Sequence, residues 1–248
     1  AEGDTFTNIE HIVGSGQDDT IIGDANDNTF IGGAGADTLT GGAGNDTADY
    51  STSLAGVTVD LANGTGLGGD AEGDQLSEIE TVVGSNLSDT LIGDAGDNTF
   101  DGGFADDELR GGEGSDRYIF GFDSSSDRIV EQGNAGDIDR VIFAEGVEVA
   151  DVSLVRDGDS LLIELENDDG FLIDTLLVQD HFLGTETGIE ELVFSDGTIY
   201  TRADIFNLYR NDRFNAVDDT VRFADEDLGF NIDASLLTAN DTETGDDT

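Results

Sequence analysis

Single apolar residues recur every nine positions in two parts of the chain, residues 14–49 and 84–119. Each is the middle residue of a three-residue run, and the residue before it is Thr in six of the eight copies. The eight apolar residues are Ile21, Phe30, Leu39, Ala48, Leu91, Phe100, Leu109 and Tyr118. A strand of three residues points its middle side chain to one side and the two neighbours to the other. The pattern therefore predicts eight very short strands that share one core.

Glycine opens every copy of this nine-residue unit. The first-position residues are Gly14, Gly23, Gly32, Gly41, Gly84, Gly93, Gly102 and Gly111. Glycine permits the positive φ angles of a tight turn. Two units then make one coil of strand, turn, strand and turn, so that residues 18 apart stack at roughly 4.8 Å, the spacing of neighbouring strands.

The sixth position of the unit carries an acid or its amide. These residues are Asp19, Asn28, Asp37, Asp46, Asp89, Asn98, Asp107 and Asp116. Stacking at an offset of 18 residues places Asp19 over Asp37, Asn28 over Asp46, Asp89 over Asp107 and Asn98 over Asp116. Asp and Asn are also common turn formers, but eight copies in one register favour a ligand column.

Carboxylates this close repel each other unless a cation lies between them, and turn carbonyls would complete an all-oxygen shell. Calcium prefers such a shell, whereas magnesium demands stricter octahedral geometry and zinc prefers nitrogen or sulfur. The candidate metal ligands are therefore the eight sixth-position side chains, with the carbonyls of the eight first-position glycines and of Ala34 and Ala43.

The charge of the chain leads to the same expectation. There are 57 acidic and 9 basic residues, and the net charge is −48. Such a chain repels itself when compact and will not bind nucleic acid or an anionic membrane by charge. A surface adapted to high salt could add to the acidic excess. With 36% hydrophobic residues, we expect a chain that is unfolded without divalent cations and folded with them.

Further features place the chain within a longer protein. Residues 1–33 align with residues 71–103 without a gap, and 21 of the 33 positions are identical. The chain thus starts part-way through a repeating unit, and we expect it to be a fragment. Cysteine is absent, so no disulfide can form, and no apolar run reaches transmembrane length.

The segments GGAGADTLTGGAGNDTA and GGEGSDRYIFG resemble the GGxGxDxUx nonapeptide of RTX, or haemolysin-type, calcium-binding repeats. The resemblance is strong at residues 32–49 and 111–119. It is weaker in the turns where Asn28 and Asn98 replace the aspartate and where the fourth-position Gly is replaced, by Gln17, Asn26, Leu87 and Ala105. Those turns are expected to hold calcium weakly or not at all. It implies an all-β fold, a right-handed parallel β-roll (a β-solenoid) over residues 1–120 with several bound Ca²⁺ ions.

Residues 50–83 separate the two repeat blocks and resemble the spacer often found there. Val57–Leu61 alternates as a strand does, and Asn63-Gly64 is a turn signal. We expect the spacer to continue the stack or to carry a hairpin.

Residues 121–206 resemble the β-rich cap that commonly follows RTX repeats, and a cap would cover the exposed end of the stack. Asp157-Gly158 predicts a hairpin, and Thr201 with Asp204 predicts the start of a short helix near 201–209. The expected strands are 128–131, 140–143, 152–155, 161–165, 171–178 and 191–194.

Residues 207–248 are expected to be a linker and the truncated start of another domain. From about residue 215 the sequence resembles the opening of a bacterial cadherin-like or Ig-like tandem domain. About 34 residues are too few for a complete sandwich.

Catalytic chemistry is not predicted. The chain has no HExxH, no GxSxG and no phosphate-binding glycine loop followed by Lys. His11 and His181 are expected to be structural or solvent-exposed. The outward Thr column could be an ice-binding face, but half of the copies carry Ala at the third position, which disfavours that function.

Two functions remain. The favoured one is a calcium-dependent structural module of a large secreted bacterial protein, an adhesin exported by type I secretion that binds a cell-surface or polysaccharide ligand through other parts. The alternative is the calcium module of an extracellular protease, lipase or polysaccharide epimerase, with its catalytic domain outside these residues. Neither involves membrane insertion by this part of the protein.

Overall fold

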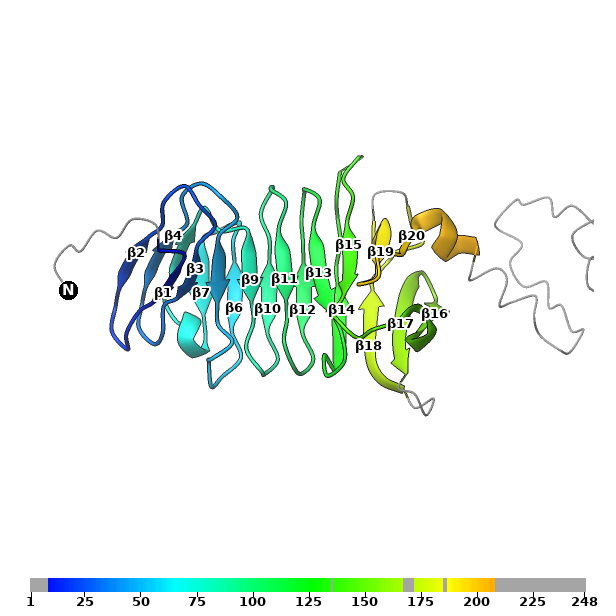
Figure 1. The fold of residues 1–248 in the computed structure, drawn as a ribbon, viewed down its shortest axis with the longest axis horizontal. Helices are drawn as coiled ribbons and strands as arrows, with labels where there is room; N and C mark the ends of the chain where they lie inside the picture. Colours follow the sequence, from blue (N-terminus) through cyan, green and yellow to red (C-terminus); the bar gives the residue numbers. More distant parts are fainter. Residues whose placement is uncertain (1–8, 135, 167–171, 185–186, 208–248) are drawn as a thin grey trace, which may run out of the picture. The chain divides into compact units, whose positions relative to one another are not determined.

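A computed structural model describes residues 9–134, 136–166, 172–184 and 187–207 (Figure 1). These residues belong to one compact unit, residues 1–212, and residues 213–248 form a second unit. The predicted cadherin-like start lies outside the described residues. The predicted domain boundaries near residues 120 and 206 stay a prediction.

Short strands stack into two sheets (Figure 1). In spatial order the first sheet contains β1 (His11–Val13), β3 (Thr29–Ile31), β5 (Thr47–Asp49), β9 (Thr81–Val83), β11 (Thr99–Asp101), β13 (Arg117–Phe120), β15 (Arg140–Phe143), β19 (Glu191–Val193) and β20 (Ile199–Thr201). The second sheet contains β2 (Thr20–Ile22), β4 (Thr38–Thr40), β8 (Gln75–Ser77), β7 (Thr65–Leu67), β6 (Thr58–Asp60), β10 (Thr90–Ile92), β12 (Glu108–Arg110), β14 (Ser126–Ile129), β18 (Leu172–Val178), β17 (Ser160–Glu166) and β16 (Val152–Asp157).

Successive coils pair in parallel at the predicted offset of 18 residues. Thr20 pairs with Thr38, and Thr90 pairs with Glu108. The apolar column is the core, because all eight predicted residues are at most 8% exposed. Phe100 stacks on Tyr118 of the next coil, with ring centroids 5.9 Å apart. The predicted parallel β-roll is confirmed.

The spacer contributes differently to the two sheets of the stack. In the first sheet β5 pairs directly with β9. In the second sheet β8, β7 and β6 lie between β4 and β10, where regular coiling would place a single strand. The hairpin turn at Asn63 and Gly64, with Gly64 at φ 64°, returns β7 antiparallel to β6. The spacer therefore both continues the stack and adds two strands to one sheet.

The second half continues the two sheets. β14 follows β12 and β15 follows β13, both in parallel, and β16–β17–β18 form an antiparallel meander with the predicted turn at Asp157 and Gly158. Two 3₁₀ turns lie at Gly69–Ala71 and Val149–Asp151. Residues 202–207 are helical, and the Thr201 hydroxyl donates to Asp204 Oδ2 at 2.6 Å, as predicted.

One predicted strand is displaced. The strand expected at 128–131 lies at Ser126–Ile129, because Ser126 pairs with Thr175 and Arg128 with Glu108. The shift puts Glu131 beyond the strand, in the turn that leads toward β15.

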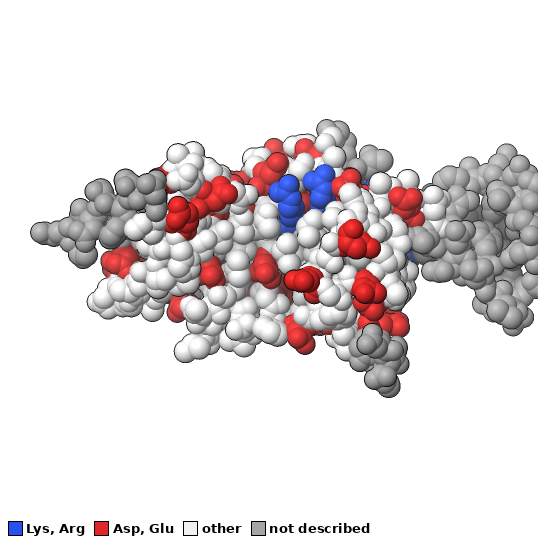
Figure 2. All heavy atoms as spheres, in the orientation of Figure 1, with Lys and Arg blue, Asp and Glu red and all other residues white. Residues whose placement is uncertain are grey.

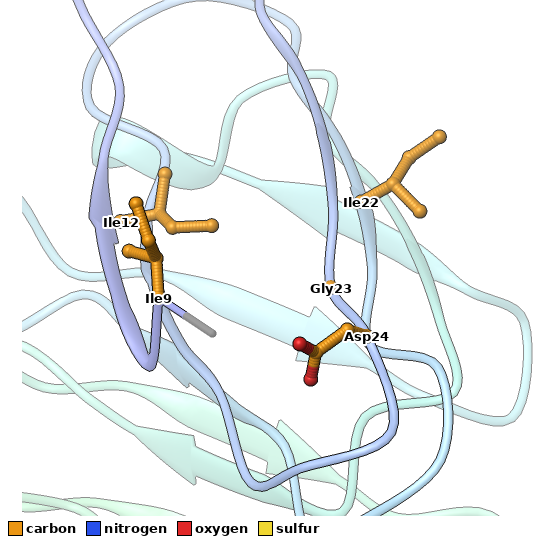
Figure 3. Close-up of a pocket in the computed structure, with 5 residues that line it drawn as sticks. All are labelled: Ile9, Ile12, Ile22, Gly23 and Asp24. Atoms are coloured by element: carbon orange, nitrogen blue, oxygen red, sulfur yellow. The ribbon is translucent and has the colours of Figure 1, made fainter. Parts of the chain in front are cut away.

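The first described coil contains β1 and β2. Figure 3 shows a small pocket there, with Ile9 and Ile12 opposite Ile22, Gly23 and Asp24. Among the described residues β1 and β2 are the first strands of their sheets, so this pocket lies at the first described coil. Among the described residues, no helix has the length and apolar content needed to span a bilayer.

Candidate metal centres

The sixth-position side chains form two columns, one along each row of turns. Within a column, the backbone N–H of one sixth-position residue donates to a carboxylate oxygen of the next coil. The distances are 2.8 Å from Asp19 to Asp37, 2.8 Å from Asn28 to Asp46, 2.8 Å from Asp89 to Asp107, and 2.7 Å from Asn98 to Asp116. One oxygen of each receiving carboxylate therefore links two coils, and the other is left for a second partner.

The eight turns are of two kinds. In four of them the second carboxylate oxygen of the sixth-position Asp has no hydrogen-bond partner, although it is fully buried. These are the oxygens Oδ2 of Asp37, Asp46, Asp107 and Asp116. In the other four turns the backbone N–H of the second residue donates to a sixth-position side-chain oxygen, with donors Ser15, Asp24, Ser85 and Asp94.

The second residue of the turn explains this division. It is Gly in the four turns with an unpaired oxygen, and it has a positive φ, for example 92° at Gly33 and 90° at Gly103. That conformation favours glycine. Where Ser or Asp stands at this position, its N–H is directed at the sixth-position side chain instead, and the turn closes on itself.

Burial raises the pKa of the carboxyl groups with unpaired oxygens. The pKa of Asp107 rises to about 8 and that of Asp116 to about 7, mainly through desolvation, and those of Asp37 and Asp46 rise for the same reason. By contrast, hydrogen bonds from Ser15 lower the pKa of Asp19. A buried carboxylate without a partner is costly, so the four unpaired oxygens fit a hard cation.

The backbone around these oxygens is closely packed. The first-position glycines leave no room for a side chain, because a Cβ on Gly32 or Gly102 would collide with Asp37 Oδ2 or Asp107 Oδ2. Ala34 and Ala43 lie exposed at the outer part of their turns. Whether the carbonyls of these residues bind a metal stays a prediction.

Both columns extend beyond the eight predicted residues. The N–H of Asp37 donates to Asp74, that of Asp46 to Glu80, that of Asp107 to Asp127, and that of Asp116 to Asp139, all at 2.8–2.9 Å. The sequence nevertheless carries a signal for these residues. Each stands two positions before an inward apolar residue, as Asp139 does before Val141.

A basic side chain ends one column. Asp139 N–H donates to Glu190, and Glu190 pairs with Arg202 at 2.9 Å. Arg202 also donates to the carbonyls of His181 and Gly184. His181 is fully buried and its Nδ1 accepts from Ile189 N–H at 3.2 Å, which agrees with a structural role. Burial and Arg202 lower the pKa of His181 to about 3.

Comparisons with known families agree with this geometry. Residues 10–48 and 83–118 match the RTX calcium-binding nonapeptide repeat, described as four copies. The chain therefore contains RTX calcium-binding repeats. Residues 160–204 match the haemolysin-type calcium binding protein related domain, which includes Glu190 and Arg202. RTX repeats bind Ca²⁺ at multiple sites, and the four unpaired oxygens lie within the matched residues.

Other comparisons add little detail. No curated protein matches the chain. Among solved structures, the extracellular lipase LipA from Serratia marcescens aligns at 19% identity with a TM-score of 0.29. The alignment covers 69% of this chain and 38% of the lipase.

The surface of the RTX stack is acidic. Figure 2 shows carboxylates spread over the visible face, with the few basic side chains close together near its middle. Two arginines of the stack share one partner: Arg110 and Arg128 both pair with Glu108. Exposed pairs of this kind contribute little to stability, so they do not balance the buried carboxylates of the columns.

Proposed function

We propose that this chain is a calcium-dependent folding and structural module of a large secreted bacterial protein, and that it has no catalytic activity of its own. The observation that carries the proposal is the set of four buried, unpaired carboxylate oxygens of Asp37, Asp46, Asp107 and Asp116. When bound, Ca²⁺ supplies positive charge and oxygen coordination to such groups. Binding free energy then becomes folding free energy.

This chemistry supports export in the unfolded state. The repeats contribute only three residues per strand and bury mainly one side chain from each, so the apolar core of a coil is small. Inside a cell, where free calcium is low, the carboxylates repel and the coils stay open. Sites of the weak extracellular class, with dissociation constants of roughly 10⁻⁴–10⁻³ M, would fill outside. RTX-repeat proteins are generally exported by type I secretion.

Circular dichroism during a calcium titration tests the proposal, with EDTA reversal and a magnesium titration as controls. We expect strand content to rise cooperatively with calcium and to be lost with EDTA. Magnesium should act much more weakly because it keeps its water and demands octahedral geometry. Full strand content in EDTA at neutral pH would refute the proposal.

We further propose that the parent is an adhesin of the bacterial cell surface, whose ligand contacts lie in other parts. Support comes from residues 215–248, which resemble the start of a tandem extracellular domain. Sequencing the parent gene on both sides of residues 1–248 tests this. Further tandem domains would support it, whereas an adjoining protease, lipase or epimerase domain would favour the enzyme alternative.

A further inference from the structure

Three buried carboxyl groups meet just beyond the last nonapeptide. Asp116, Glu131 and Asp139 are 0%, 2% and 2% exposed, and one oxygen of each lies within 4.8 Å of the others. Glu131 and Asp139 lie between β14 and β15, outside both the repeat match, which ends at residue 118, and the related-domain match, which begins at residue 160.

The oxygens of this cluster converge on the space beside Gly111. A Cβ on Gly111 would meet Asp116 Oδ2, the Tyr118 hydroxyl and Glu131 Oε2. Tyr118 donates its hydroxyl to Glu131 Oε2, and Asp116 N–H donates to Asp139 Oδ1 at 2.8 Å. Asp116 Oδ2 is fully buried, points into this space and has no hydrogen-bond partner.

No side-chain cation balances the cluster within the described part of the chain. The neighbouring basic groups are engaged elsewhere: Arg140 pairs with Glu191 at 2.7 Å, and Arg202 pairs with Glu190. None of the described ion pairs includes Asp116, Glu131 or Asp139. Three carboxyl groups that meet with only hydroxyl and amide donors beside them form an all-oxygen, acidic cluster.

We propose, resting on the calcium-dependent function proposed above, that Asp116, Glu131 and Asp139 bind a divalent cation of the calcium class. The site joins the last nonapeptide turn, which supplies Asp116, to the segment between β14 and β15, which supplies the other two carboxylates. Hard oxygen ligands with a flexible arrangement suit calcium better than zinc or magnesium. The ion would join the last RTX turn to the segment that follows, so folding of the two parts would be coupled.

Tyr118 makes this site measurable. Tb³⁺ replaces calcium at oxygen sites and emits when a nearby tyrosine absorbs light. The chain has no Trp and four Tyr, so tyrosine is the only antenna. Tyr118 touches Glu131, and Tyr50 donates to Asp74 at 2.9 Å in the first half of the stack. Tyr50→Phe in all proteins removes that second antenna.

The test uses the full chain carrying Tyr50→Phe, with and without Glu131→Gln. Glutamine keeps the size of the side chain and removes its charge. Glu145→Gln, at an exposed position two residues after β15, is the matched control. We expect Glu131→Gln to lose one bound calcium equivalent by equilibrium dialysis and most of the tyrosine-sensitised Tb³⁺ emission, and we expect Glu145→Gln to lose neither.

Unchanged stoichiometry and emission in a folded Glu131→Gln protein would overturn the site. If that variant does not fold, anomalous diffraction from crystals of the unsubstituted chain grown with Tb³⁺ decides the question. A peak bonded to Glu131 and Asp139 supports the site, and peaks in the repeat turns without one here refute it. An absence of all peaks would instead contradict the proposed function, so the two failures are distinguishable.

Discussion

The second residue of each RTX turn controls what the sixth-position side chain can bind. Ser85 N–H donates to Asp89 Oδ2 at 2.5 Å, while Gly103, at a positive φ, leaves Asp107 Oδ2 without a partner. Every turn of the first kind lies one coil before a turn of the second kind. Each pair therefore combines one turn that is closed by its own backbone with one that needs an external cation.

Two isosteric substitutions test the difference between the two kinds of turn. Asp37→Asn removes charge from an unpaired buried oxygen, whereas Asp19→Asn changes a side chain whose Oδ2 already accepts Ser15 N–H and the Ser15 hydroxyl. We expect Asp37→Asn to raise the calcium midpoint of folding roughly tenfold, which corresponds to about 1.4 kcal/mol. Asp19→Asn should raise it clearly less. Equal midpoints in the two variants, measured by circular dichroism, would contradict the division of the turns.

At the scale of elements, the segment after the repeats supplies its own cation. Arg202 begins the helical residues 202–207 and holds Glu190 together with the carbonyls of His181 and Gly184. The column of carboxylates that starts in the repeats thus ends on a guanidinium, which stays charged at any accessible pH. This end of the stack does not depend on calcium for its last charge pair.

Removing that guanidinium should destabilise the protein even in saturating calcium. Arg202→Gln leaves Glu190 largely buried without its partner, and breaking such a pair costs roughly 3 kcal/mol. We expect a clearly lower Tm in thermal unfolding. Arg110→Gln is the control, because Arg110 is about half exposed and its pair with Glu108 contributes little. A Tm for Arg202→Gln equal to that of the control would show that Arg202 has no such role.

The elements that could be predicted are those with a fixed period. Nine-residue spacing predicts the inward residues from Ile21 to Tyr118 and the pairing of coils 18 residues apart, because the strand spacing and side-chain alternation leave one arrangement. Hairpins such as Asp157-Gly158 follow from local turn chemistry.

The remaining elements depend on loops of variable length. Asp116 meets Asp139 after 23 residues, Asp46 meets Glu80 after 34, and Asp37 meets Asp74 after 37. No period predicts these partners, since the chain between them can pair in more than one register. The turn signal at Asn63-Gly64 predicts a hairpin in the spacer, but its insertion between β4 and β10 of the second sheet could not be predicted, for the same reason.

For the whole molecule, net charge and burial act together on the calcium-free state. The pKa values of Asp107, Asp116, Asp127 and Asp139 are raised to about 7 or 8, chiefly by desolvation. A carboxyl group with a raised pKa binds more protons in the folded state than in the unfolded one, so stability falls as the pH rises from about 4 toward the raised value.

Acid should therefore substitute in part for calcium. In the presence of EGTA, we expect strand content to increase as the pH is lowered from 8 to 5, because the buried carboxyl groups take up protons and the repulsion falls. Far-ultraviolet circular dichroism across this range is the measurement. An EGTA sample that remains unfolded at pH 5 would show that neutralising these groups is not sufficient for folding.

Because Arg202 completes its column without an added cation, this end of the stack depends less on calcium than the repeat turns do. The end of the stack that contains Arg202 can therefore order first. Each coil that orders next, toward residue 9, then pairs its strands with a coil that is already ordered.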